Sequence, residues 1–145
     1  MQRTVRVRAV IPFDGKCLFV KHTHDASFWA LPGGKLETGE GLKDGLCREL
    51  LEELGTLAVV GDLVYVQQLF FHDEESLEFF FMIENGANFE DIDLSKTTHG
   101  RHELYEAKFI DPARDRVLPE FLGTMMDDLK SLKLPQVHVQ RQSRL

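Results

Sequence analysis

Apolar residues recur along this chain with two periods, one typical of strands and one of helices. Five segments are rich in Val, Leu and Phe, alternate in part with polar residues and therefore predict strands: residues 4–12, 16–22, 57–71, 77–83 and 104–110. Asp14-Gly15 predicts a turn between the first two segments, and residues 72–76 predict a turn between the third and the fourth.

Two further segments follow the spacing of an amphipathic helix. Between residues 42 and 54 leucines recur at every fourth position, with Cys47 and Leu51 beside them. Residues 118–132 follow helical spacing less regularly. Because an amphipathic helix must bury its apolar stripe against another layer, these segments predict helices packed on a mixed sheet, which is an α+β fold.

The first predicted helix has an acidic side opposite its apolar side. At 100° per residue the leucines occupy one half, and Glu49, Glu52 and Glu53 fall within an arc of about 100° on the other half. Like charges at this spacing cost roughly 0.2–0.5 kcal/mol per pair. The helix is expected to end at Gly55, so the carboxylates also lie at the negative end of its dipole. A positive group should therefore compensate them.

A divalent cation is one such group. A merely solvated helix face normally mixes Lys with Glu, whereas this acidic arc has only Arg48 at its edge and Gly45 in its middle. We expect the missing side chain of Gly45 to leave room for a bound group. An ion pair between Arg48 and Glu40 could fix the preceding loop against the helix. Three convergent carboxylates suit Mg²⁺, which prefers oxygen ligands.

Composition limits what such a site can serve. The length fits one domain over residues 1–145, large enough to fold without a metal or a disulfide. The net charge of −7 argues against sequence-independent binding of duplex nucleic acid, but it allows a small polyanion held through a cation. Neither a signal peptide nor an apolar run of about 18 residues is present, so we expect a cytoplasmic protein without a membrane partner.

The segment from residue 34 to residue 56 resembles the signature of the Nudix hydrolase family, which is G-x5-E-x7-R-E-U-x-E-E-x-G-U with U apolar. The matching positions are Gly34, Glu40, Arg48, Glu49, Leu50, Glu52, Glu53 and Gly55. Thr56 departs from the pattern, because an apolar residue is expected there. A match over so many spaced positions is far more specific than a lone glycine motif.

The resemblance implies a MutT-like fold in which a mixed β-sheet is sandwiched between α-helices. It also implies a hydrolase that cleaves a phosphoanhydride in a nucleoside diphosphate linked to another group. Glu49, Glu52 and Glu53 would then hold Mg²⁺ or Mn²⁺, while Arg48 and Glu40 would support them. Such cations neutralise charge on phosphate oxygens and orient the attacking water.

Residues outside the signature supply further catalytic candidates. Family members often recruit a carboxylate or a base from the region that corresponds to the long polar connection over residues 84–103. Glu103 is the candidate here, because it abuts the strand that follows; a solvated glutamate is the alternative. His99 and His102 could act as a base near neutral pH, although surface histidines are the simpler interpretation.

Candidate substrate-binding residues flank the signature. Gly33 and Gly34 would let the backbone approach the substrate closely, although such a pair is commonly only a turn. The ring of Phe28 could stack on a nucleobase, with core packing as the alternative. Arg8, on the same side of its strand as Arg6, could reach an anionic group, with a solvated strand face as the alternative.

Two rival functions are considered. A noncatalytic Nudix-like domain that binds a nucleotide or a protein would be expected to lose glutamates, and none is missing here. Another chemistry on the same fold, such as isoprenoid diphosphate isomerisation, would need a catalytic cysteine, whereas Cys47 is expected on the core side of its helix.

Substrate and assembly stay open at this point. Nucleoside triphosphates, dinucleotide polyphosphates and nucleotide sugars all remain candidates, and the lack of a proline between Pro32 and Pro112 makes ADP-ribose a weaker one. If the strand over residues 77–83 lies at a sheet edge, it could pair with a second copy in a homodimer.

Overall fold

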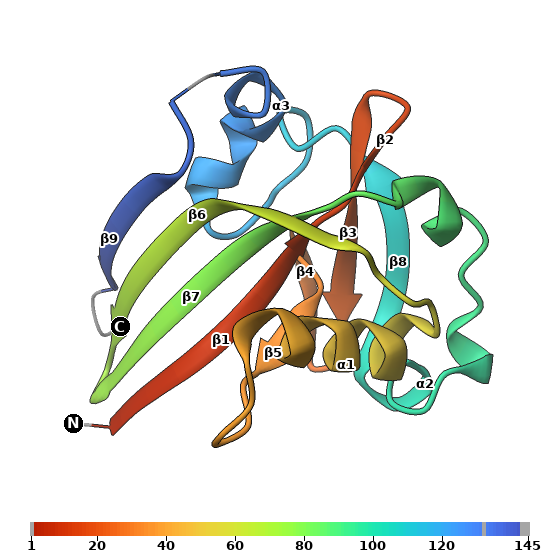
Figure 1. Ribbon diagram of the computed structural model, residues 1–145, viewed down its shortest axis with the longest axis horizontal. Helices are drawn as coiled ribbons and strands as arrows, with labels where there is room; N and C mark the ends of the chain where they lie inside the picture. The colour runs from red at the N-terminus through yellow and green to blue at the C-terminus, as the bar shows by residue number, and fades with distance from the viewer. Residues whose placement is uncertain (1, 132, 143–145) are drawn as a thin grey trace.

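The computed structural model describes residues 2–131 and 133–142, whose strands form two sheets (Figure 1). The larger sheet has the strand order β5 (Gly33–Lys35), β1 (Gln2–Val10), β7 (Glu74–Ile83), β6 (Val60–Phe71) and β9 (Gln136–Gln142). The smaller sheet contains β2 (Pro12–Phe13), β3 (Lys16–His22), β4 (Asp25–Ala30) and β8 (Leu104–Ile110). The larger sheet is mixed, as predicted, because β1 runs parallel to β7 while β6 runs antiparallel to it.

The predicted strands exist, with shifted ends. β6 begins at Val60 instead of residue 57, and β7 begins at Glu74 instead of residue 77, which leaves residues 72–73 for the turn. Residues 4–12 divide between β1 and β2. β4, β5 and β9 are not among the five strands predicted above. β5 and β9 flank the sheet, where they pair with β1 and β6.

Helices are few among the described residues. α1 (Leu42–Leu54) has the predicted bounds and ends at Gly55, whose φ of 72° is left-handed. α2 (Gly100–Glu103) and α3 (Met125–Asp128) contain four residues each. Two short 3-10 helices, η1 (Gly86–Phe89) and η2 (Leu94–Lys96), lie in the long polar connection. None of these helices is long and apolar enough to cross a membrane.

The helix predicted over residues 118–132 is wrong for most of its length. In its place a 3-10 helix, η3 (Glu120–Thr124), leads into the single turn of α3. Pro119 cannot donate a helical hydrogen bond, and Gly123 has low helix propensity, so this segment cannot sustain a regular α-helix. Residue 132 lies outside the described residues.

The larger sheet separates two apolar clusters, which confirms an α+β fold. The cluster beneath α1 contains the helix leucines and inward residues of the strands: Leu46, Leu50, Leu54, Val7, Ala9, Phe81 and Ile83. The cluster on the opposite face contains residues of β6 and β7 with residues of β4, η3 and α3: Tyr65, Phe80, Trp29, Leu122 and Met125. The second layer thus consists of the smaller sheet and short helical turns rather than a long helix.

The alternation of side chains along the central strands determines which of them lie on the sheet face that α1 does not cover. Val7 of β1 points into the cluster beneath α1, so Arg6 and Arg8 lie on the opposite face. Arg6 pairs in register with Glu78 of β7, and Glu78 pairs with Gln67 of β6. A row of polar side chains therefore crosses the face that α1 leaves uncovered.

The strand over residues 77–83 does not lie at an edge. It belongs to β7, which is hydrogen-bonded to β1 on one side and to β6 on the other. The route to a homodimer considered for this strand is therefore wrong, because its backbone groups are already paired.

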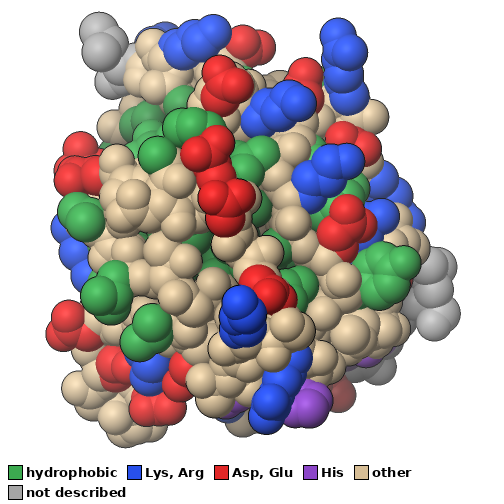
Figure 2. Space-filling view, turned by 90° about the vertical axis from the view of Figure 1, so that its right-hand side faces the viewer, with side chains coloured by type: hydrophobic (Ala, Val, Ile, Leu, Met, Phe, Trp, Pro, Cys, Tyr) green, Lys and Arg blue, Asp and Glu red, His purple; other side chains and the backbone are tan. Residues whose placement is uncertain are grey.

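Charged side chains of both signs share the face shown in Figure 2. Lys and Arg side chains there are interspersed with Asp and Glu, and hydrophobic side chains lie between them (Figure 2). Because the described part of this face has no field of a single sign, it does not resemble the basic surfaces that track a phosphate backbone.

Substitution of Gly33 should test the contact between β5 and β1. Gly33 has a φ of +147°, and a Cβ atom there would overlap the carbonyl oxygen of Val7. Gly39 also has a positive φ, +83°, but its Cβ would meet open space. We expect Gly39→Ala to lower the free energy of unfolding by about 1–2 kcal/mol and Gly33→Ala to lower it distinctly more, as measured by urea denaturation. Equal losses would contradict the close contact.

Candidate active site

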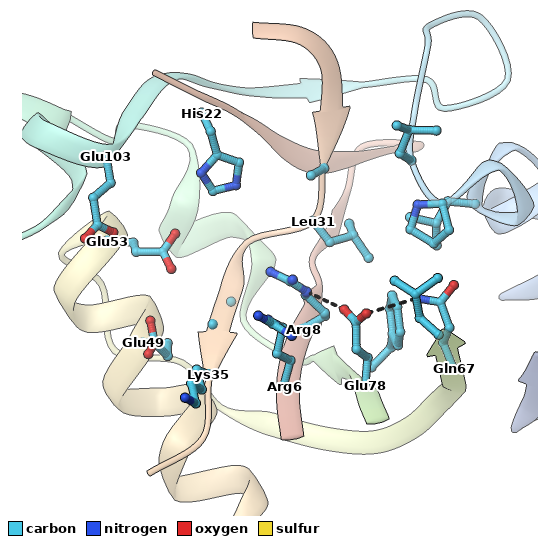
Figure 3. A pocket seen from close by; sticks show the side chains of 18 of the residues that line it. Arg6, Arg8, His22, Leu31, Lys35, Glu49, Glu53, Gln67, Glu78 and Glu103 are labelled. Atoms are coloured by element: carbon cyan, nitrogen blue, oxygen red, sulfur yellow. Dashed lines mark hydrogen bonds and ion pairs between the residues drawn. The ribbon is translucent and has the colours of Figure 1, made fainter. Parts of the chain in front are cut away.

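A pocket of about 1100 Å³ opens over the sheet face that α1 leaves uncovered. Most of the sequence candidates line it: Arg8, Phe28, Gly33, Gly34, Arg48, Glu49, Glu52, Glu53 and Glu103. Glu40 lies outside the lining and contacts it through Arg48. Figure 3 shows the carboxylates of Glu49, Glu53 and Glu103 on one side of the pocket, with Arg6 and Arg8 beside them. The signature and the sheet thus contribute to one site.

Arg48 supplies the positive charge nearest to the acidic side of α1. Its Nε donates to Glu40 Oε2 at 2.7 Å, which confirms the expected ion pair between loop and helix. Its Nη1 donates to Glu49 Oε1 at 3.0 Å and to Glu52 Oε2 at 3.2 Å. The hydrogen bonds from Arg48 lower the pKa of Glu40 below its usual value. Two of the three helix carboxylates are therefore compensated.

Glu53 is the carboxylate that stays uncompensated. Its side chain is almost fully enclosed, with 3% of the residue exposed, and Oε2 has no hydrogen-bond partner among the described residues. Burial raises the pKa of Glu53 to about 9, and the nearby charge of Glu49 contributes to the increase. A buried carboxylate oxygen without a donor costs free energy unless a cation or a proton reaches it.

The chemistry of these carboxylates suits a metal ion, but their side chains are not arranged to hold one. Carboxylate oxygens are the preferred ligands of Mg²⁺ and Mn²⁺, and the free Oε2 of Glu53 offers one. Across residues 2–131 and 133–142, however, no three His, Cys, Asp or Glu side chains are arranged to hold a metal ion. Glu49 and Glu52 are bonded to Arg48 instead. Metal binding would therefore require their side chains to turn.

Two glycines of the signature region admit side chains of the protein itself. A Cβ on Gly34 would collide with the carboxylate of Glu49, so glycine at this position of β5 lets Glu49 reach the pocket. A Cβ on Gly45 would collide with Leu36 and would lie 2.9 Å from Glu40 Oε1. The expectation that Gly45 leaves room for a bound group is therefore wrong, because Leu36 and Glu40 occupy that space.

The segment around α2 docks on the end of α1 and brings Glu103 to the pocket. The backbone N–H of His99 donates to the carbonyl oxygen of Glu52 at 2.9 Å, and His99 Nδ1 lies 3.1 Å from Glu52 Oε2. Gly100 packs directly against the backbone of Glu53. These contacts place Glu103 near enough to Glu53 to contribute to its raised pKa. His99 lines the pocket, whereas His102 does not.

The pocket lining also includes His22, together with Glu78 and Gln67, which were not singled out from the sequence. His22 lines the pocket, where burial lowers its pKa and nearby Arg8 lowers it further. Glu78 Oε1 accepts from Arg8 Nε at 3.0 Å, and Glu78 Oε2 accepts from Gln67 Nε2 at 3.2 Å. The period-two pattern of β6 and β7 could place Gln67 and Glu78 on one face. It could not show that Arg8 reaches them.

The aromatic candidates differ in exposure. Trp29 is buried in the cluster opposite α1, and Lys21 Nζ lies 4.6 Å from the centre of its ring. Phe28 is half-buried and lines the pocket. Phe28 belongs to neither apolar cluster, so the part of its ring that lines the pocket is available for a planar ligand.

Comparison with known proteins identifies the family. A family profile described as the NUDIX domain matches residues 2–121, which is most of the chain. The chain belongs to the NUDIX family. The resemblance inferred from the signature is thereby confirmed, and Nudix hydrolases generally depend on divalent metal ions.

Individual Nudix relatives agree with this assignment. A CTP pyrophosphohydrolase of Escherichia coli (strain K12) is 42% identical over 65 residues, which cover 43% of this chain and 48% of that protein. The match thus spans about half the length of that relative. The solution structure of the E. coli ORF135 protein has a TM-score of 0.71 at 24% identity, and the alignment covers 92% of this chain and 93% of that one. The crystal structure of UDP-X diphosphatase has a TM-score of 0.75 at 19% identity over 94% and 68% of the two chains. Both structures share the fold.

The raised pKa of Glu53 predicts how stability changes with pH in the metal-free Nudix protein. Between the ordinary pKa near 4.5 and the folded value of about 9, the folded state binds more protons than the unfolded state. Stability should therefore fall as pH rises through this range. Glu53→Gln removes the effect, so its stability relative to the parent should increase by up to about 1.4 kcal/mol per pH unit.

Urea denaturation of both proteins at pH 5 and pH 8, with a chelator present, measures this difference. A stability gain for Glu53→Gln that is the same at both pH values would contradict the raised pKa.

Proposed function

We propose that this chain is a metal-dependent nucleotide pyrophosphohydrolase, which cleaves a phosphoanhydride in a nucleoside diphosphate linked to another group. The observation that carries the proposal is the buried Glu53 carboxylate, whose Oε2 has no hydrogen-bond partner among the described residues and which lies in a pocket that Arg6 and Arg8 also line. Membership of a family of hydrolases supports the reaction class. The name of the E. coli relative, CTP pyrophosphohydrolase, supports a nucleotide as substrate.

Glu49, Glu52 and Glu53 are the proposed ligands of Mg²⁺ or Mn²⁺. When bound, the cation would neutralise charge on phosphate oxygens and lower the pKa of a water molecule. Arg48 and Glu40 are proposed to position the ligands, because Arg48 bonds to Glu49 and Glu52 while Glu40 holds it from the other side. Glu53 must lose its proton to act as a ligand.

Glu103 is the proposed acceptor of the water proton. Attack of water on phosphorus forms a new P–O bond, the bridging P–O bond breaks, and the leaving phosphate oxygen carries away the negative charge. The carboxylate of Glu103 lines the pocket on the same side as Glu53. His22 lies nearby, and its lowered pKa keeps it uncharged near neutral pH, so it can accept a hydrogen bond there.

The rest of the pocket is proposed to hold the substrate. Arg8 faces the carboxylates and would meet a phosphate group. The backbone at Gly33 and Gly34 would lie along the phosphates, although the absence of side chains there also serves contacts within the protein. The half-buried Phe28 lines the pocket, and its ring would stack on a nucleobase.

The rival functions receive less support. No observation in the described residues favours a noncatalytic binding domain over an enzyme. Isoprenoid diphosphate isomerisation lacks its cysteine, because Cys47 Sγ donates to the carbonyl oxygen of Ala58 at 3.5 Å and lies outside the pocket lining, as does buried Cys17.

Removal of the charge at Glu53 tests the reaction and its ligand together. With Mg²⁺ or Mn²⁺ and a panel of nucleoside triphosphates, nucleotide sugars and dinucleotide polyphosphates, the parent should release phosphate-containing products from at least one substrate. Glu53→Gln should reduce kcat by about 100-fold or more on that substrate, because a ligand charge is lost without a change in volume.

Asp44→Asn is the matched control for this variant. Asp44 lies in the first turn of the same helix, is exposed and lies outside the pocket lining. Its substitution should leave kcat unchanged. Near-parental turnover by Glu53→Gln, with a melting temperature at or above that of the parent, would refute the assignment of this ligand.

A further inference from the structure

Arg8, Glu78 and Gln67 form a hydrogen-bonded chain across three strands of the pocket floor. Glu78 is 5% exposed and Gln67 is 1% exposed, so both belong to the pocket floor but present little surface to it (Figure 3). Glu78 accepts from Arg8 Nε at 3.0 Å with one oxygen and from Gln67 Nε2 at 3.2 Å with the other. Each carboxylate oxygen is therefore committed to a different partner.

The chain determines which part of Arg8 is free. Because Glu78 engages Nε, the two terminal nitrogens of Arg8 remain, and neither has a hydrogen-bond partner among the described residues. Figure 3 shows the guanidinium extending from β1 toward the side where Glu53 and His22 lie. Arg8 is close enough to influence the pKa of both groups. The two terminal nitrogens of Arg8, called the fork below, thus face the end of the pocket where the carboxylates lie.

Gln67 restricts how Glu78 can move. If Gln67 did not bond to Oε2, the Glu78 carboxylate could rotate and accept from the terminal nitrogens of Arg8, where arginine and carboxylate pair readily. The amide orientation of Gln67 is itself fixed, because a carboxylate oxygen accepts from the NH₂ group but repels the amide oxygen. The hydrogen bond from Gln67 therefore keeps the Glu78 carboxylate paired with Arg8 Nε and leaves the fork free to bind a ligand.

Gln67 performs this task at a cost to stability. Its Oε1 is buried and has no hydrogen-bond partner among the described residues. A buried acceptor without a donor lowers stability relative to an apolar side chain of the same shape. Packing alone would favour a residue such as methionine at this position, so the glutamine is better explained by its bond to Glu78.

We infer that Gln67 and Glu78 are positioning residues that hold the free fork of Arg8 toward a phosphate group of the substrate. The inference rests on the proposed function, in which Arg8 binds a phosphate, and it adds two residues that act through Arg8 without touching the substrate. A nearly matched chain on the opposite sheet face provides a comparison. There Arg3 and Gln68 both donate to Glu75, at 3.1 and 2.8 Å, and none of the three lines the pocket.

Binding of nonhydrolysable nucleotides tests the inference without turnover. The probes are nucleoside triphosphate analogues with a methylene group at the α,β bridge, presented with Mg²⁺. Analogues of four nucleobases are compared on the parent, and the one that binds most tightly is used for the titrations. Gln67→Met should weaken binding by about tenfold, the value of one hydrogen bond to a charged group. The same variant should keep or raise the melting temperature, because the unpaired amide oxygen is removed. Gln68→Met should leave the Kd unchanged.

A double-mutant cycle with Arg8→Lys then shows whether Gln67 acts through Arg8. Lysine carries a single amino group and cannot present the fork, so Arg8→Lys should itself weaken binding. In that background Gln67→Met should change the Kd by less than about twofold, because the group that it positions is gone. If Gln67→Met does not fold, Glu78→Gln serves in the same cycle, since it removes the charge that holds Nε while keeping the shape.

The outcomes separate this inference from the proposed function. Equal losses of affinity from Gln67→Met in the parent and in the Arg8→Lys background would overturn the inference, as would failure of every analogue to bind the parent. Hydrolysis by the parent alongside such an additive cycle would leave the proposed function standing. A coupled cycle without hydrolysis of any natural nucleotide would support the inference and count against the proposed reaction.

Discussion

Repulsion between carboxylates at the end of α1 is the constraint on which the site depends. Arg48 compensates Glu49 and Glu52, and it is held in place by Glu40. Glu53 lies deeper, and its Oε2 has no hydrogen-bond partner among the described residues. The protein therefore keeps one buried acid that is favourable only when it holds a proton or faces a cation. Two neighbouring contacts belong to this arrangement. The segment around α2 packs on the end of α1, and the absence of a side chain at Gly34 leaves room for the Glu49 carboxylate.

The sheet imposes the second half of the architecture through alternation. One face of the larger sheet carries the apolar cluster that α1 covers, which fixes the position of the acidic helix end. The other face presents arginines from β1, and Glu78 with Gln67 behind them holds Arg8. Opposite charges meet in one pocket because the helix and the strand are attached to the same sheet. An anion that bridges them would be held from both sides.

Features encoded by local spacing could be predicted from the sequence. The bounds of α1, the pairing of Arg48 with Glu40 and the position of the acidic side follow from residues within one short segment. Features created by distant contacts could not. β5 and β9 are strands because β1 and β6 pair with them, and the space beside Gly45 is filled by Leu36, whose position depends on the loop. The position of Glu103 at the pocket could be anticipated, because this residue directly precedes β8. The hydrogen-bonded link from Arg8 through Glu78 to Gln67 could not, because Arg8 and Gln67 are 59 positions apart and such a link has no local sequence signal.

Thermal unfolding with and without a divalent cation tests the central claim most directly, because a ligand that prefers the folded state must stabilise it. We expect millimolar Mg²⁺ or Mn²⁺ to raise the melting temperature of the parent at pH 7.5, since the cation relieves the repulsion at Glu53 and its neighbours. The increase should be largely lost in Glu53→Gln. An unchanged melting temperature of the parent with either cation, in the presence or absence of nucleotide, would contradict the account.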